Sequence, residues 1–95
     1  MRYAVDIDGT ICFTRGNDYE NSTPIFDNIG KINKLYDEGH EIVYNTARGG
    51  TSGKDWYDFT WKKLVEWDCK FHDLRADKLS ADVYIDDKSI RIEEL

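Results

Sequence analysis

The chain has 95 residues, enough for one domain, residues 1–95, with a modest core. Its 13 basic and 19 acidic residues give a net charge of −6, which disfavours a nucleic-acid-binding protein because such proteins need a basic face. No apolar run approaches the ~18 residues of a membrane span, and the amino terminus lacks the apolar stretch of a signal peptide. Two cysteines make no disulfide framework, so we expect a cytoplasmic protein with no membrane association.

The first half of the chain predicts a strand, a turn and a helix. The apolar run 3–7 is typical of a buried strand, and the polar residues within 11–21 favour a turn or a small hairpin. The Ser-Thr-Pro segment 22–24 predicts a helix start, with a hydroxyl cap followed by a proline. Gly39 is expected to end this helix. Its predicted buried face consists of Ile25, Ile29, Ile32 and Leu35 or Tyr36.

The second half continues this alternation. Residues 41–46 predict a strand, and a second helix is expected from Asp55 to about Asp68. Further short strands are expected at 70–74 and 83–85. Because strands that alternate with helices imply parallel crossovers, we expect an α/β, three-layer Rossmann-like fold, a small parallel sheet flanked by helices. The candidate buried residues of the second helix are Phe59, Trp61, Leu64, Val65 and Trp67.

Acidic residues gather at the carboxyl ends of the predicted strands. Asp6 and Asp8 come at the end of the first strand, and Asp86 and Asp87 follow the last. Thr46 ends the second strand. Since open α/β sheets bind ligands outside the carboxyl ends of their strands, we expect these groups to share one site. Gathered carboxylates repel one another unless a cation balances them, and a set of oxygen ligands favours Mg²⁺.

These residues resemble the motifs of a known family. The segment 6–10, Asp-Ile-Asp-Gly-Thr, matches the D-x-D-G-T signature of the haloacid dehalogenase (HAD) superfamily of phosphatases. The strand ending in Thr46 resembles the second motif of that family. Lys78 resembles the lysine of the third motif, and Asp86 with Asp87 resembles the paired acids of the fourth. The four motifs occur in the order of the family and cover nearly the whole chain.

The resemblance implies an enzyme, a phosphoric monoester phosphatase that works through an aspartyl-phosphate intermediate. Asp6 would be the nucleophile, and Asp8 would act as the general acid and then as the general base. The implied cofactor is Mg²⁺, held by the Asp6 side chain, the Asp8 backbone carbonyl and Asp86, with Asp87 acting through water.

Phosphate and substrate contacts follow from the same resemblance. Thr46 and Lys78 would hold the phosphoryl oxygens, and Lys54 and Lys88 are rivals to Lys78. Arg48 lies in a glycine-rich polar loop, where it is either a substrate contact or a surface residue. In the family, the lysine of the third motif comes shortly before the last strand, as Lys78 does here. We therefore favour Lys78 over its two rivals.

The chain leaves no room for the cap domain that many family members carry. About a dozen residues separate Asp8 from the first predicted helix, and fewer than ten separate Thr46 from the second. We therefore expect a HAD-like core without a cap, similar to small phosphatases of surface-polysaccharide gene clusters. That similarity implies a sugar phosphate or a similar small metabolite as substrate. The abundance of large aromatic residues is compatible with a homo-oligomer.

Two other functions stay open. A capless site could admit the 3′-phosphate end of a nucleic acid, which the net charge of −6 disfavours. Receiver domains of two-component systems also place acids, a threonine and a lysine at strand ends with Mg²⁺. Their paired acids come early in the chain, however, whereas the pair here comes last.

Overall fold

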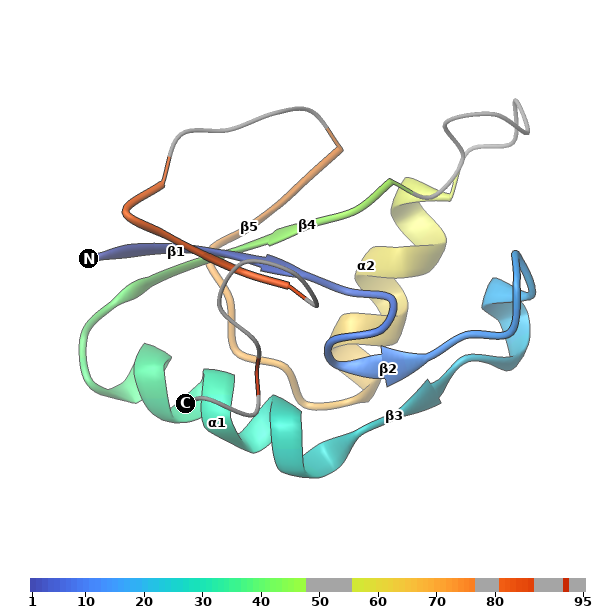
Figure 1. The fold of residues 1–95 in the computed structure, drawn as a ribbon, viewed down its shortest axis with the longest axis horizontal. Helices are drawn as coiled ribbons and strands as arrows, with labels where there is room; N and C mark the ends of the chain where they lie inside the picture. The colour runs from blue at the N-terminus through green and yellow to red at the C-terminus, as the bar shows by residue number, and fades with distance from the viewer. Residues whose placement is uncertain (48–55, 77–80, 87–91, 93–95) are drawn as a thin grey trace.

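A computed structural model of the chain describes residues 1–47, 56–76, 81–86 and 92 (Figure 1). In these residues four parallel strands form one sheet in the order β5-β4-β1-β6. The strands are β1 (Arg2–Asp6), β4 (Glu41–Asn45), β5 (Asp73–Arg75) and β6 (Val83–Ile85). The other elements are the helices α1 (Phe26–Asp37) and α2 (Tyr57–Glu66), the short strands β2 (Cys12–Phe13) and β3 (Thr23–Pro24), and the 3₁₀ helix η1 (Tyr19–Asn21).

The strand predictions are largely confirmed. The strands expected at 3–7, 41–46 and 83–85 are present within one residue at each end. The strand expected at 70–74 begins only at Asp73. Its first part is held differently, because the backbone N–H of Lys70 donates to a side chain of α1, Asn33, at 2.8 Å.

The hydrophobic core covers one face of the sheet. Both helices pack against that same face, because buried residues of α1 and α2 join one cluster with alternate residues of the strands. The crossovers from β1 to β4 and from β4 to β5 run in the same direction, and right-handed crossovers then place both helices on the same side. The expected third layer is therefore not seen in the part of the chain that the structure describes. Central members of the cluster are Val5, Ile29, Ile32, Tyr44, Leu64, Leu74 and Ile85.

The amino end of α1 differs from the prediction. Residues 23–24 pair with β2 as an antiparallel strand, and the helix begins only at Phe26. Ile25 occupies the cap position and makes no side-chain cap hydrogen bond. The Ser22 hydroxyl, in the segment expected to supply a cap, lies 2.7 Å from the hydroxyl oxygen of Thr14 instead. The proline is tolerated because an edge strand does not need every backbone N–H.

Both helices end in a Schellman turn. After α1, Gly39 has a φ of +96°, and the N–H of His40 donates to the carbonyl of Leu35 at 3.2 Å. The prediction that Gly39 ends this helix is confirmed. After α2 the equivalent position is Asp68, with a φ of +60°. Aspartate is among the few residues that tolerate this left-handed conformation.

Helix α2 buries a narrower face than expected. Leu64 and Trp67 are buried as predicted, and Thr60 is buried one turn earlier. Trp61 and Val65 are 38% and 56% exposed, so the prediction of burial was wrong for both. Each follows a buried residue directly, and the rotation of about 100° per residue carries its side chain away from the core. The expected helix start at residue 55 lies outside the described residues.

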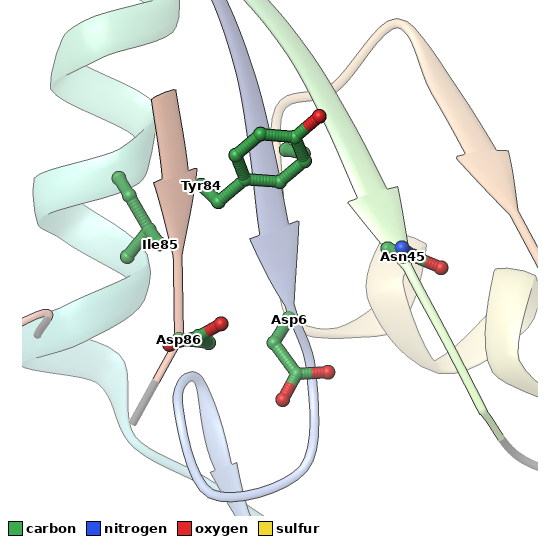
Figure 2. A pocket seen from close by; sticks show the side chains of 6 residues that line it. Asp6, Asn45, Tyr84, Ile85 and Asp86 are labelled. Carbon is green, nitrogen blue, oxygen red and sulfur yellow. The ribbon is translucent and has the colours of Figure 1, made fainter. Parts of the chain in front are cut away.

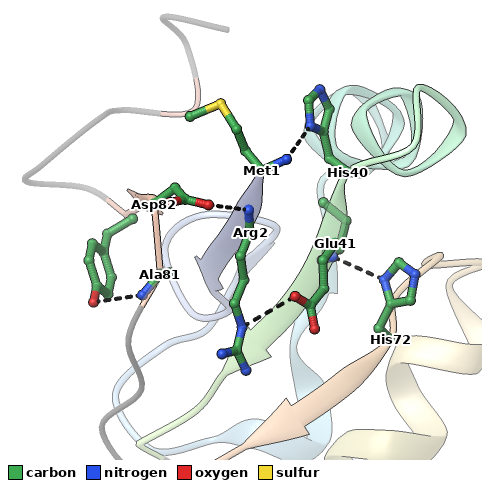
Figure 3. Close-up of polar contacts among 9 residues, drawn as sticks. Met1, Arg2, His40, Glu41, His72, Ala81 and Asp82 are labelled. Carbon is green, nitrogen blue, oxygen red and sulfur yellow. Dashed lines mark hydrogen bonds and ion pairs between the residues drawn. The ribbon is translucent and has the colours of Figure 1, made fainter.

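Polar contacts fix the amino end of β1 between its neighbours (Figure 3). The backbone N–H of Arg2 donates to Asp82 at 2.7 Å, and its guanidinium pairs with Glu41 at 3.6 Å. The terminal ammonium of Met1 lies 3.1 Å from Nδ1 of His40. These contacts hold β1 in register with β4 and β6.

None of the described helices is long and apolar enough to cross a membrane.

Two weakly acidic groups lie in the core. Burial raises the pKa of the Cys69 thiol to about 12. Burial also raises the pKa of the Tyr44 hydroxyl well above its usual value, and the nearby Cys69 adds to that shift. The folded protein therefore keeps both protons at a pH at which an exposed thiol loses its own.

Stability should consequently fall as the pH rises above about 9. The unfolded chain releases the Cys69 proton near pH ~8.5 and the Tyr44 proton near pH ~10, so it binds fewer protons than the folded state. The contribution is complete below pH ~8.5 and is lost as the pH approaches the folded pKa of Cys69, about 12. Urea unfolding between pH 7 and 10.5 measures this, and we expect a loss of the order of a few kcal/mol. Cys69→Ala should flatten the dependence; an unchanged slope would contradict the assignment.

Candidate functional site

The strand order creates a switch point beside β1. From β1 the chain passes through α1 to β4 on one side, whereas β6 lies on the other side of β1. Open α/β sheets bind ligands at such a reversal, outside the carboxyl ends of the strands. A pocket of about 190 Å³ lies on the sheet face that carries Ala4 and Tyr84 and extends to the carboxyl ends of β1 and β6 (Figure 2). Its lining residues are Ala4, Asp6, Asn45, Tyr84, Ile85 and Asp86.

Two predicted site residues, Asp6 and Asp86, line this pocket together. Asp6 is the last residue of β1, and Asp86 directly follows β6. The two strands pair in parallel, with Val5 opposite Ile85, so both acids come at the same end of the sheet. Figure 2 shows their carboxylates beside each other at these strand ends. Both side chains are partly buried, which makes their interaction with a charged ligand stronger than in water.

Asp8 lies in the turn that follows β1. The turn is closed by Gly9, which has a φ of +85°, and by backbone N–H groups of residues 10 and 11 that donate to the Ile7 carbonyl at 3.1 and 3.0 Å. The Asp8 carboxylate is held from the β2 side: the hydroxyl of Thr14 donates to its Oδ1 at 2.6 Å. Asp8 is thus two residues from the pocket acid Asp6 and is fixed by the ribbon of β2 and β3.

Thr46 is buried directly after β4, and its backbone N–H donates to the carbonyl of Arg75 at 2.9 Å. It is not among the residues that line the pocket described above. The residue before it, Asn45, does line the pocket, because it lies opposite Asp6 in the register of β1 and β4.

Sequence reasoning missed Asn45 and Tyr84. Tyr84 is 43% exposed although it lies in a strand, and its hydroxyl accepts a hydrogen bond from the backbone N–H of Ala81 at 3.1 Å. The sequence could have indicated Tyr84, because side chains two residues apart in a strand lie on the same face and Tyr84 therefore shares a face with Asp86. Finding Asn45 needed the register between β1 and β4, which the sequence does not supply.

The remaining candidates lie outside the described residues. These are Arg48, Lys54, Lys78, Asp87 and Lys88, and their expected roles stay predictions.

The residues of the pocket fit a magnesium ion in part. Among the described residues, no group of three or more His, Cys, Asp or Glu side chains is arranged to hold a metal. Mg²⁺ does not require such a cage, because it keeps several waters and is commonly bound by one or two carboxylates together with a substrate phosphate. Asp6 and Asp86 supply two carboxylates at one pocket, and they lie among oxygen donors rather than thiols or imidazoles.

Comparison with known proteins adds support for the fold. No family model matches the chain, and no curated protein matches it. A crystal structure of a structural-genomics target from Vibrio cholerae is similar to it, with a TM-score of 0.74 and 25% sequence identity. The similarity covers 99% of this chain and 86% of that one. This chain therefore shares its small α/β arrangement with a solved protein over nearly the full length of this chain.

Proposed function

We propose that the chain is a Mg²⁺-dependent phosphatase with the capless core of the HAD superfamily, acting on a phosphate monoester of a small metabolite. The observation that carries this proposal is the pocket at the switch point, where Asp6 and Asp86 come together from adjacent strand ends. Asp8, two residues after Asp6, is a third acid in the turn that follows β1, although it is not among the residues that line the pocket.

The arrangement of the elements supports the capless core. The connection from β1 to α1 consists of a turn, the β2–β3 ribbon and η1, all within the described residues. That connection is one of the two places where a cap domain could be inserted, and it holds none; the other, after β4, lies largely outside the described residues. The three strands that end in motif residues, β4, β1 and β6, are direct neighbours.

In the proposed reaction a carboxylate oxygen of Asp6 attacks phosphorus, and the bond from phosphorus to the leaving oxygen breaks. Asp8 gives its proton to that leaving oxygen. Asp8 then takes a proton from a water molecule, which attacks the aspartyl phosphate, releases inorganic phosphate and regenerates Asp6. Thr46 and Lys78 bind the phosphoryl oxygens in this proposal.

Asp6, Asp86 and the backbone carbonyl of Asp8 would hold Mg²⁺, with Asp87 acting through water. When bound, the ion offsets the repulsion between the carboxylate of Asp6 and the negatively charged phosphate. Without it, the pocket would bring two carboxylates and a phosphate dianion together, which is electrostatically costly.

The part of the pocket that the described residues line is small. Its volume of about 190 Å³ is below the ~300–1,000 Å³ usual for sites of drug-sized ligands. The net charge of −6 also disfavours a long polyanion such as a nucleic acid. A phosphorylated sugar or a metabolite of similar size fits both observations.

The direct test is phosphate release from a panel of phosphorylated sugars, nucleotides and oligonucleotide 3′-phosphates, with Mg²⁺ and with chelator. We expect release from a small phosphate ester that stops with chelator and returns with Mg²⁺. No release from any member of the panel would reject the proposal. A preference for oligonucleotide ends would favour the nucleic-acid alternative, and stable phosphorylation by acetyl phosphate without turnover would favour the receiver alternative.

Asp86→Asn should raise the Mg²⁺ concentration for half-maximal activity by at least about tenfold, because it removes one of two carboxylates at the pocket. Titration of activity with Mg²⁺ measures this shift. Saturating Mg²⁺ should recover part of the rate in the variant. An unchanged titration would place the ion elsewhere.

Tyr84→Ala should raise KM for the preferred substrate by about tenfold, since the exposed ring forms an apolar wall beside Asp86. The turnover number should change little because the ring does not take part in bond breaking. Tyr84→Phe keeps the ring and is the matched control, with a KM within about twofold of wild type. A loss confined to the turnover number would show that Tyr84 does not contact the substrate.

A further inference from the structure

A chain of hydroxyl groups leads from the β2–β3 ribbon to Asp8. Thr14, directly after β2, donates its hydroxyl proton to Oδ1 of Asp8 at 2.6 Å. Ser22, directly before β3, has its hydroxyl oxygen 2.7 Å from that of Thr14. A threonine hydroxyl has one proton, and that of Thr14 is directed to Asp8, so Ser22 is the donor in the second bond.

These bonds are well placed to fix a carboxylate. The 2.6 Å distance between Thr14 and Asp8 is typical of a hydrogen bond to a charged oxygen, which is about twice as strong as one between neutral groups. The three side chains are partly buried, which limits competition from water. The thiol of Cys12 also contacts Oδ1, at 3.5 Å. The Thr14 hydroxyl and the Cys12 thiol therefore contact the same carboxylate oxygen of Asp8.

The ribbon that carries the two hydroxyl groups is itself anchored to the turn after β1. The backbone N–H of Gly9 donates to the carbonyl of Cys12 at 2.9 Å, and the N–H of Ile25 donates to the carbonyl of Ile11 at 2.8 Å. Thr14 and Ser22 therefore belong to a frame whose position relative to Asp8 is set by the backbone.

We propose that Thr14 is a positioning residue for Asp8, and that Ser22 orients the Thr14 hydroxyl. This inference rests on the proposed function, in which Asp8 transfers the proton. By holding Oδ1, Thr14 fixes the rotation of the carboxyl group, and the transferred proton is carried by the other oxygen, Oδ2. Thr14 acts only through Asp8, and correct orientation of a proton donor can be worth orders of magnitude in rate.

The test compares two phosphate monoesters with different leaving groups. A dinitrophenolate leaves without protonation, whereas an alkoxide needs the proton of Asp8. Thr14→Val removes the hydroxyl at nearly constant shape. We expect the rate of leaving-group release in the first turnover, before water attacks the phosphoenzyme, to fall by about 10- to 100-fold for an alkyl phosphate and by less than about threefold for dinitrophenyl phosphate. KM should stay within about twofold for both.

Thr14→Ser restores the hydroxyl and should recover the alkyl phosphate rate to within about threefold of wild type. Ser22→Ala should show the same selectivity with a smaller loss, about three- to tenfold. An equal loss on both substrates, or no loss at all, would overturn the positioning role while leaving the phosphatase proposal intact. A wild-type protein inactive on both esters would reject the phosphatase proposal, and this inference with it.

A measurement that needs no activity checks the bond itself. In a double-mutant cycle of Asp8→Ala and Thr14→Val, the unfolding equilibrium constants should show a coupling of about tenfold, because each single change breaks the same charge-assisted hydrogen bond. Additive effects would mean that the bond contributes nothing in solution, and the inference would fail. Circular dichroism spectra confirm that each variant is folded before either comparison.

Discussion

Asp6→Asn should reduce phosphate release by about 10⁴- to 10⁶-fold, the loss expected when the nucleophile of an enzyme is removed. Asparagine has nearly the same shape as aspartate, so it should leave the end of β1 and its pairing with β4 intact. An amide oxygen, however, is too weak a nucleophile to form the acyl phosphate. The rate of phosphate release with saturating Mg²⁺ measures the effect.

Loss of one negative charge in an acidic protein is a separate effect, and Glu38→Gln controls for it. Glu38 is exposed after α1, in the turn that leads to the amino end of β4, whereas the pocket reaches the carboxyl end of that strand. Its replacement should change the rate by less than about twofold. Beryllium trifluoride mimics a phosphoryl group on a carboxylate, so fluorine NMR should show it bound to wild type and not to Asp6→Asn. Substantial turnover by Asp6→Asn would exclude Asp6 as the nucleophile.

Much of the fold follows from local sequence patterns. The apolar runs of β1, β4 and β6 and the three- and four-residue spacing of α1 identify these elements because burial on one side demands such periods. The position of acids at the carboxyl ends of strands also located Asp6 and Asp86, since parallel strands bring these ends to one edge. These inferences needed only the chain direction and the side-chain period.

The features that were missed depend on contacts between distant segments. A serine, a threonine and a proline in sequence suit the start of a helix and an edge strand equally well, and pairing of residues 23–24 with β2 decides between them. Likewise, apolar side chains lie on several sides of α2, so its sequence does not indicate which side is buried. In the structure Thr60 is buried, whereas the next residue, Trp61, is exposed. Only packing against the sheet sets that rotation.

The hydroxyl chain to Asp8 is another long-range feature. Thr14 and Ser22 are eight residues apart, and nothing in their local sequence links them to each other. The antiparallel pairing of β2 with β3 brings them together, and the turn after β1 then brings Asp8 to Thr14. Motif matching finds Asp8 because it belongs to a continuous segment, and it misses the groups that orient it.

Asp8→Asn is the second change with a large expected effect. It should slow turnover of an alkyl phosphate by about 10²- to 10⁴-fold, because neither protonation of the leaving oxygen nor activation of water can occur. The amide oxygen of asparagine can still accept the hydrogen bond from Thr14, so the variant removes proton transfer and keeps the contact that fixes the side chain.

The two steps can be separated by the choice of leaving group. With dinitrophenyl phosphate the first step needs no acid, so Asp8→Asn should release about one equivalent of dinitrophenol rapidly and then stall as the phosphoenzyme. Rapid-quench kinetics measure the burst, and mass spectrometry detects the phosphoryl group on the protein. Adding Thr14→Val to Asp8→Asn should cost little more, because a positioning residue has no effect once the group that it positions cannot transfer a proton. Equal slowing of both esters by Asp8→Asn, without a burst, would remove Asp8 from proton transfer and leave it as a structural acid of the turn.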